Sequence, residues 1–215
     1  KKDTIGGWIE KESNLDDNAW VGDEACVYGN SHVYGNSHVY GNTEVYGYAQ
    51  VYGNAQMHGN AEIFGDAYVF GNACVCDNAC VFGNACVYDN AWISEDACVY
   101  EDAQVYGDSE IFGDVQVYGN AQISGGNLYG NIKIRKNGSI KSNSDYLLIR
   151  GLGSENRTTT FYRTKTKDII WVSCGCFTGS LDEFEKKVVE THGDNDYGKE
   201  YIAMINVAKI HYKLD

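Results

Sequence analysis

A run of cationic side chains beside hydroxyl groups is the first candidate for binding chemistry in this sequence. Residues 133–167 carry nine lysines and arginines against only Asp145 and Glu155. Guanidinium groups, threonine hydroxyls and backbone amides together suit a phosphate group. We therefore expect a site for a small, nucleotide-like anion, and the alternative is that these cations pair with acidic groups of this chain or of a neighbouring subunit. The candidate ligand-binding residues are Arg150, Arg157, Thr158, Thr159, Thr160, Arg163 and Lys165.

Eight cysteines form the second candidate group. One residue separates Cys74 from Cys76 and Cys174 from Cys176, so a strand would place each pair of sulfurs on one side. Zinc sites usually use Cys-x-x-Cys spacing and four ligands, so we expect free thiols, no bound metal and no cofactor. The N-terminal sequence KKDTIGGW lacks the apolar core of a secretory signal. We therefore expect a reducing, cytoplasmic environment.

A six-residue repeat covers most of the chain and must position these groups. Val or Ile recurs at every sixth residue from Val21 to Ile123, with Met57 as the one departure, and a small residue, usually Ala, follows four places later. In an Ala-x-Val strand the two apolar side chains point the same way. Gly-Asn pairs, which tolerate positive φ, form the corners. Three such units predict a triangular coil, and neighbouring coils stack about 4.8 Å apart.

This pattern resembles the hexapeptide-repeat family over residues 9 to about 144. The resemblance implies a left-handed parallel β-helix, and because members are commonly trimers, we expect a homotrimer. After Ile123 the repeat slips by one residue, since the next aliphatic residues are Leu128, Ile134 and Ile140. We therefore expect a less regular last coil, whose end needs a polar cap or a second domain.

The outward positions of the repeat form columns along the predicted solenoid. Stacked aromatic side chains stabilise neighbouring coils, and large exposed aromatic faces also mark subunit interfaces; both interpretations stay open. Six of the cysteines occupy outward positions, and Cys80 and Cys98 lie one coil apart. Two columns are aromatic and the third is mixed: Tyr28, Tyr46, Phe64, Phe82, Tyr100 and Tyr118; Tyr34, Tyr52, Phe70, Tyr88 and Tyr106; and Tyr40, His58, Cys76, Ser94 and Phe112.

The family resemblance also raises the alternative of a hexapeptide-repeat acyltransferase. Such enzymes use a histidine general base and an acyl donor that is often the polyanion coenzyme A. The candidate bases in the repeat are His32, His38 and His58, but only the last two share a face of the predicted coil. No loop interrupts residues 21–123, and no cation there could hold a phosphate. We therefore expect no catalytic residue and a non-enzymatic protein.

The six-residue period ends near Ser144, which divides the chain into a β-helix at 1–144 and a small α+β domain at 145–215. Alternating apolar residues predict three strands, over 145–150, 158–167 and 169–177, with the last two meeting at Lys167-Asp168. Ser180 and Glu183 form a capping box that opens a helix to about residue 191. A second helix is expected over roughly 196–212. The fold class is mainly β.

The C-terminal residues, from TTTFYRTKTKDIIWVSCGCF through LDEFEKKVVETHGDNDYGKEYIAMI, resemble a tail found on phage and prophage proteins. That resemblance implies a viral origin and a role in binding. The hypothesis is a protein that sequesters or blocks a component of host defence, such as a nucleotide signal, in the host cytoplasm. The structural alternative is an assembly component of a virion or fibre.

Charge and hydropathy exclude two further classes. Between Lys11 and Lys133 there is no lysine or arginine, whereas that stretch has seventeen acidic residues. Such a surface repels phosphate backbones, so extended nucleic acid is excluded as a partner. No segment approaches the roughly 18 apolar residues of a membrane helix, so we expect no membrane partner.

Overall fold

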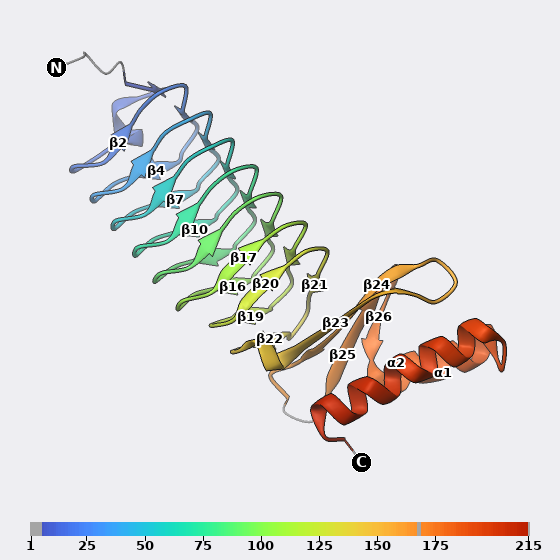
Figure 1. The fold of residues 1–215 in the computed structure, drawn as a ribbon. Coiled ribbons are helices and arrows are strands. Elements are labelled where there is room, and N and C mark those ends of the chain that lie inside the picture. Colours follow the sequence, from blue (N-terminus) through green and yellow to red (C-terminus); the bar gives the residue numbers. More distant parts are fainter. Residues whose placement is uncertain (1–5, 167–168, 215) are drawn as a thin grey trace.

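The computed structural model describes residues 6–166 and 169–214 of the chain. Its first part is a three-sided parallel β-solenoid, and its second part is an antiparallel sheet with two helices packed against one face (Figure 1). This arrangement confirms the predicted fold class. None of the described helices has the length and apolar character required to span a bilayer.

Three parallel sheets form the sides of the solenoid. Each strand is two or three residues long because the chain must turn a corner after every Val or Ile. The first sheet contains β1 (Trp8–Ile9), β3 (Cys26–Val27), β6 (Glu44–Val45), β9 (Glu62–Ile63), β12 (Cys80–Val81), β15 (Cys98–Val99), β18 (Gln116–Val117) and β21 (Lys133–Ile134). The second contains β4 (His32–Val33), β7 (Gln50–Val51), β10 (Tyr68–Val69), β13 (Cys86–Val87), β16 (Gln104–Val105), β19 (Gln122–Ile123) and β22 (Ser139–Ile140). The third contains β2 (Trp20–Val21), β5 (His38–Val39), β8 (Gln56–Met57), β11 (Cys74–Val75), β14 (Trp92–Ile93), β17 (Glu110–Phe112) and β20 (Asn127–Tyr129).

The pairing register follows the period of the sequence. Val81 pairs with Val99, a separation of 18 residues, whereas Val117 pairs with Ile134, a separation of 17. The predicted one-residue slip is therefore confirmed, and the last coil closes with one residue fewer. Because the slip falls at a corner, Leu128, Ile134 and Ile140 still point inward and are fully buried.

The outward aromatic columns are continuous ring stacks. Along the two aromatic columns, neighbouring ring centroids lie 4.8–5.0 Å apart, and the ring planes differ by at most 8°. The spacing equals the distance between adjacent strands, so each ring contacts the one in the next coil. This contact confirms the stacking interpretation, and the subunit-interface interpretation stays a prediction.

The C-terminal domain differs from the prediction in its strands. It has four strands rather than three: β23 (Tyr146–Leu152), β24 (Arg157–Arg163), β25 (Ile170–Cys174) and β26 (Phe177–Ser180). The prediction of one continuous third strand over 169–177 was wrong. Gly175 adopts a positive φ of 59°, and the chain reverses there between β25 and β26. The predicted second strand ends at Arg163, and Lys167-Asp168 lies outside the described residues.

Two helices, α1 (Leu181–His192) and α2 (Asp196–Tyr212), confirm the helical part of the prediction. The Ser180 hydroxyl accepts a hydrogen bond from the Glu183 amide, and the Glu183 carboxylate accepts one from the Ser180 amide. This capping box satisfies backbone groups that a helix start would otherwise leave unpaired.

Alternation along β24 joins the two parts of the molecule. Phe161 points into the core beneath the helices, whereas its neighbour Tyr162 points into the core of the solenoid. Both side chains are fully buried. Tyr162 therefore covers the end of the last coil, and the sheet acts as the cap that an open solenoid requires.

We predict that Tyr162→Ala lowers the free energy of unfolding by about 3–5 kcal/mol, the cost of removing a buried aromatic ring. It should also accelerate amide hydrogen exchange at Ile134 and Ile140 in the last coil. Urea titration and exchange measured by mass spectrometry test both effects. Tyr48→Ala is the control, because Tyr48 is 62% exposed and its loss should change stability by at most about 0.5 kcal/mol. Unchanged exchange in the last coil of Tyr162→Ala would contradict the capping role.

Candidate functional site

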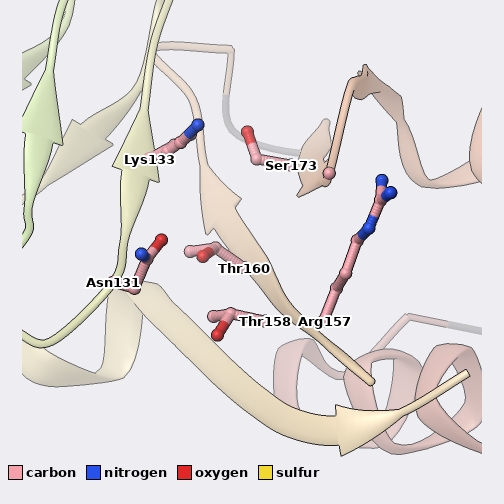
Figure 2. A pocket seen from close by; sticks show the side chains of 7 residues that line it. Asn131, Lys133, Arg157, Thr158, Thr160 and Ser173 are labelled. Atoms are coloured by element: carbon pink, nitrogen blue, oxygen red, sulfur yellow. The ribbon is translucent and has the colours of Figure 1, made fainter. Parts of the chain in front are cut away.

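A pocket lies where the last coil of the solenoid meets the antiparallel sheet. Its volume is about 210 Å³. Figure 2 shows Asn131 and Lys133 on the solenoid side, with Thr158, Thr160 and Ser173 opposite them on the sheet. Arg157 stands at the rim, and Gly175 completes the lining. We call this the junction pocket.

Strand geometry explains why Lys133 and the three hydroxyl-bearing residues face the pocket. Lys133 starts β21 at an outward position of the repeat, so its side chain leaves the solenoid while Ile134 enters the core. Thr158 and Thr160 lie two residues apart on β24 and therefore face the same way. Ser173 pairs directly with Thr160 across the sheet. The three hydroxyl groups thus form one polar surface opposite the lysine.

The Ser173 hydroxyl is buried, and no described residue lies in position to form a hydrogen bond of ordinary length and angle with it. It lies near the phenol of Tyr162, where it partly offsets the rise in the pKa of Tyr162 that burial causes. An unpaired buried hydroxyl costs free energy, and most such groups in folded proteins have a partner. The Ser173 hydroxyl therefore adds a polar atom to the wall of the pocket, beside the phenol of Tyr162.

Arg157 is held at the rim by two contacts. One guanidinium nitrogen lies 3.5 Å from the carboxylate of Glu155, and both side chains are substantially exposed. The guanidinium also rests against Gly175, where a Cβ atom would overlap it. An exposed ion pair contributes little to the free energy of unfolding. Breaking the contact with Glu155, so that Arg157 can bind an anionic ligand, therefore costs little free energy.

Arg163 and Lys165 line a different groove, of about 560 Å³, together with Lys141 and Asp145. The Nε atom of Arg163 lies 3.4 Å from an oxygen of Asp145, and its guanidinium lies 5.1 Å from the ring centroid of Tyr212. The carboxylate of Asp145 reduces the positive potential in this groove. It thereby offsets part of the charge of Arg163, as Glu155 does for Arg157 at the junction pocket.

The remaining two predicted site residues lie elsewhere. The guanidinium of Arg150 rests over Gly130 of the last coil, where a Cβ atom would clash with it. Thr159 is fully buried on the helix side of the sheet, and its hydroxyl donates to the sulfur of Cys174 at 3.1 Å. Of the seven residues predicted to form one site, the structure brings together Arg157, Thr158 and Thr160.

Asn131, Lys133, Ser173 and Gly175 were missing from the sequence-based site. Lys133 was recognisable as the first cation after a long acidic stretch. Its position opposite β24 depends on how the C-terminal sheet packs on the last coil, and no local sequence pattern predicts that packing.

The sequence analysis also predicted positions for three histidines and for the second cysteine pair. His38 lies in β5 and His58 directly follows β8, both on the side of the third sheet, whereas His32 lies in β4 of the second sheet, as predicted. The expectation that Cys174 and Cys176 share one side of a strand was wrong, because β25 ends at Cys174 and the turn at Gly175 intervenes. Cys174 is consequently buried and Cys176 exposed.

Comparisons with known proteins leave the family of this chain open. No protein-family description matches the sequence, and no curated protein matches it. A crystal structure from Bacillus cereus, of a protein provisionally named an acetyltransferase, aligns with 98% of this chain and 100% of its own. The aligned residues are 10% identical and the TM-score is 0.33, which carries no argument about fold or activity. By its fold, the chain is a parallel β-solenoid capped by a small α+β domain.

We predict that Arg163 has a mainly structural role. Arg163→Met removes a half-exposed ion pair and a cation–ring contact, so it should lower the free energy of unfolding by about 1 kcal/mol. The loss should shrink at high salt, which screens the ion pair. Arg157→Met is the matched control and should have almost no effect, since its ion pair is more exposed. Equal destabilisation by the two substitutions, measured by urea titration, would contradict the assignment.

Proposed function

We propose that the protein is a non-enzymatic binding protein whose junction pocket holds the phosphate group of a small ligand. One observation carries the proposal: the lining contains two cations and three hydroxyl groups, and none of its residues is acidic. Lys133 supplies a point charge, Arg157 supplies a planar pair of donors, and the hydroxyls complete the coordination of phosphate oxygens.

The size of the pocket limits what it can hold. Sites that enclose a drug-sized ligand usually occupy about 300–1,000 Å³, and this pocket is smaller. It therefore suits one phosphoryl group, with the rest of the ligand extending past Arg157 at the rim. The acidic solenoid nearby disfavours a long polyanion, so a mononucleotide or another small phosphate ester fits better than a nucleic acid.

The wider role that we propose follows the sequence resemblances: a hexapeptide-repeat solenoid, assembled as a homotrimer, that sequesters a nucleotide signal of host defence in the host cytoplasm. The resemblance of the C-terminal residues to a tail found on phage and prophage proteins supports this role, and so do the cations and hydroxyl groups that line the junction pocket. Acyl transfer and a structural role in a virion or fibre stay predictions, because no contact of the described residues favours either.

Calorimetric titration of the full chain with adenosine 5′-monophosphate and with inorganic phosphate tests the proposal. We expect both to bind. Lys133→Gln and Arg157→Gln should each weaken binding by about 10–100-fold, because a charge-assisted hydrogen bond contributes about 1.5–3 kcal/mol. Added salt should weaken binding further.

Two controls make the result specific. Lys165→Gln removes a cation from the neighbouring groove. It should leave the affinity within about twofold of the wild-type value, since salt screens an exposed charge that does not line the junction pocket. Adenosine, which lacks the phosphate, should not bind. Absence of binding by both phosphate probes, or an equal effect of Lys165→Gln and Lys133→Gln, would refute the proposal.

A further inference from the structure

A second cluster of reactive side chains lies on the third sheet, far along the solenoid from the junction pocket. It consists of His58, which follows β8, and of Cys74 and Cys76, which flank Val75 of β11. The donor atoms of the three residues all lie within 4.8 Å of one another. The His58 Nε2 atom lies 3.6 Å from the Cys74 sulfur.

We propose that His58, Cys74 and Cys76 bind one thiophilic divalent cation, with Zn²⁺ as the cation that this donor set fits. Around tetrahedral zinc, Zn–S bonds of about 2.3 Å and Zn–N bonds of about 2.0–2.1 Å place neighbouring ligand atoms about 3.5–3.8 Å apart. The distance from His58 to Cys74 already has this value. Binding converts two thiols to thiolates, so the complex forms with release of two protons to solvent.

Neighbouring residues already orient two of the three ligands. The indole N–H of Trp92 donates to the Cys76 sulfur at 3.1 Å and thereby fixes the position of that sulfur. The ring of Tyr40 stacks on His58 with centroids 5.2 Å apart and planes 15° apart. Contacts of this kind, outside the ligand set, fix the orientation of metal ligands and tune their basicity.

The burial of Cys76 departs from the sequence-based expectation. Its position in the repeat points outward, yet it is only 2% exposed, because the indole of Trp92 lies against its sulfur. His58 and Cys74 are half-buried beside it. The cluster is thus closed on one side and accessible on the other, which leaves a fourth coordination position for water or a further ligand.

The other two faces of the same coils supply an internal comparison. There the equivalent outward positions hold stacked rings, Phe64 on Phe82 and Phe70 on Tyr88. Ring stacking alone would favour an aromatic residue at position 76 as well. The third column instead has Cys76 at this position, one coil after His58, so its thiol lies beside the imidazole. A structural role for free thiols explains small buried side chains but not this pairing of donors.

Titration of the reduced full chain with Co²⁺, a spectroscopic substitute for Zn²⁺, tests the site. We expect one Co²⁺ per chain, a thiolate-to-cobalt charge-transfer band in the near ultraviolet, and loss of that band when Zn²⁺ is added. His58→Phe, Cys74→Ser and Cys76→Phe should each abolish or strongly weaken the band. The two phenylalanine variants place at these positions the residue that the neighbouring columns carry, so they should fold, and circular dichroism checks this.

Cys86→Ser is the matched control, because Cys86 has the same repeat position as Cys74 on another face. It should retain the band and the stoichiometry. The proposal is wrong if the wild-type chain gives no charge-transfer band, if folded His58→Phe keeps the full band, or if Cys86→Ser loses it. Phosphate binding at the junction pocket should be the same in all of these variants.

Discussion

The last coil of the β-solenoid ends in an apolar layer that no further coil can cover. Each earlier coil is covered by the next, because an inward apolar residue, usually Val or Ile, pairs with another one coil later. At the end of this series Ile134 and Ile140 stay fully buried because Tyr162 of β24 packs on the same core. The antiparallel sheet is therefore a structural requirement of the solenoid as well as a candidate binding domain.

This cap also creates the junction pocket. The space between the antiparallel sheet and the last coil is lined by Lys133 from one side and by Thr160 and Ser173 from the other. Charge changes at the same place: the solenoid before it is free of lysine and arginine from residue 12 to 132, and residues 133–167 are strongly basic. The junction pocket therefore lies where the charge of the chain changes from acidic to basic.

The sequence predicted the features that repeat and missed those that depend on two distant segments meeting. A period of six residues determines which side chains are inside, so the coils, the ring stacks and the slip after Ile123 were predictable. The turn at Gly175 was not, because a single glycine inside an apolar run is compatible with a continuous strand. The position of Lys133 opposite Thr160 depends on docking of the cap, and the approach of His58 to Cys74 depends on side-chain rotamers across two coils.

We propose that three separate segments converge on one phosphate group at the junction. Amide chemical shifts of the labelled full chain, followed by nuclear magnetic resonance during titration with inorganic phosphate, test it most directly. We expect saturable shifts concentrated at residues 131–133, 158–160 and 173–175. Shifts concentrated instead around Lys141 and Lys165, or no saturable shift anywhere, would contradict the claim.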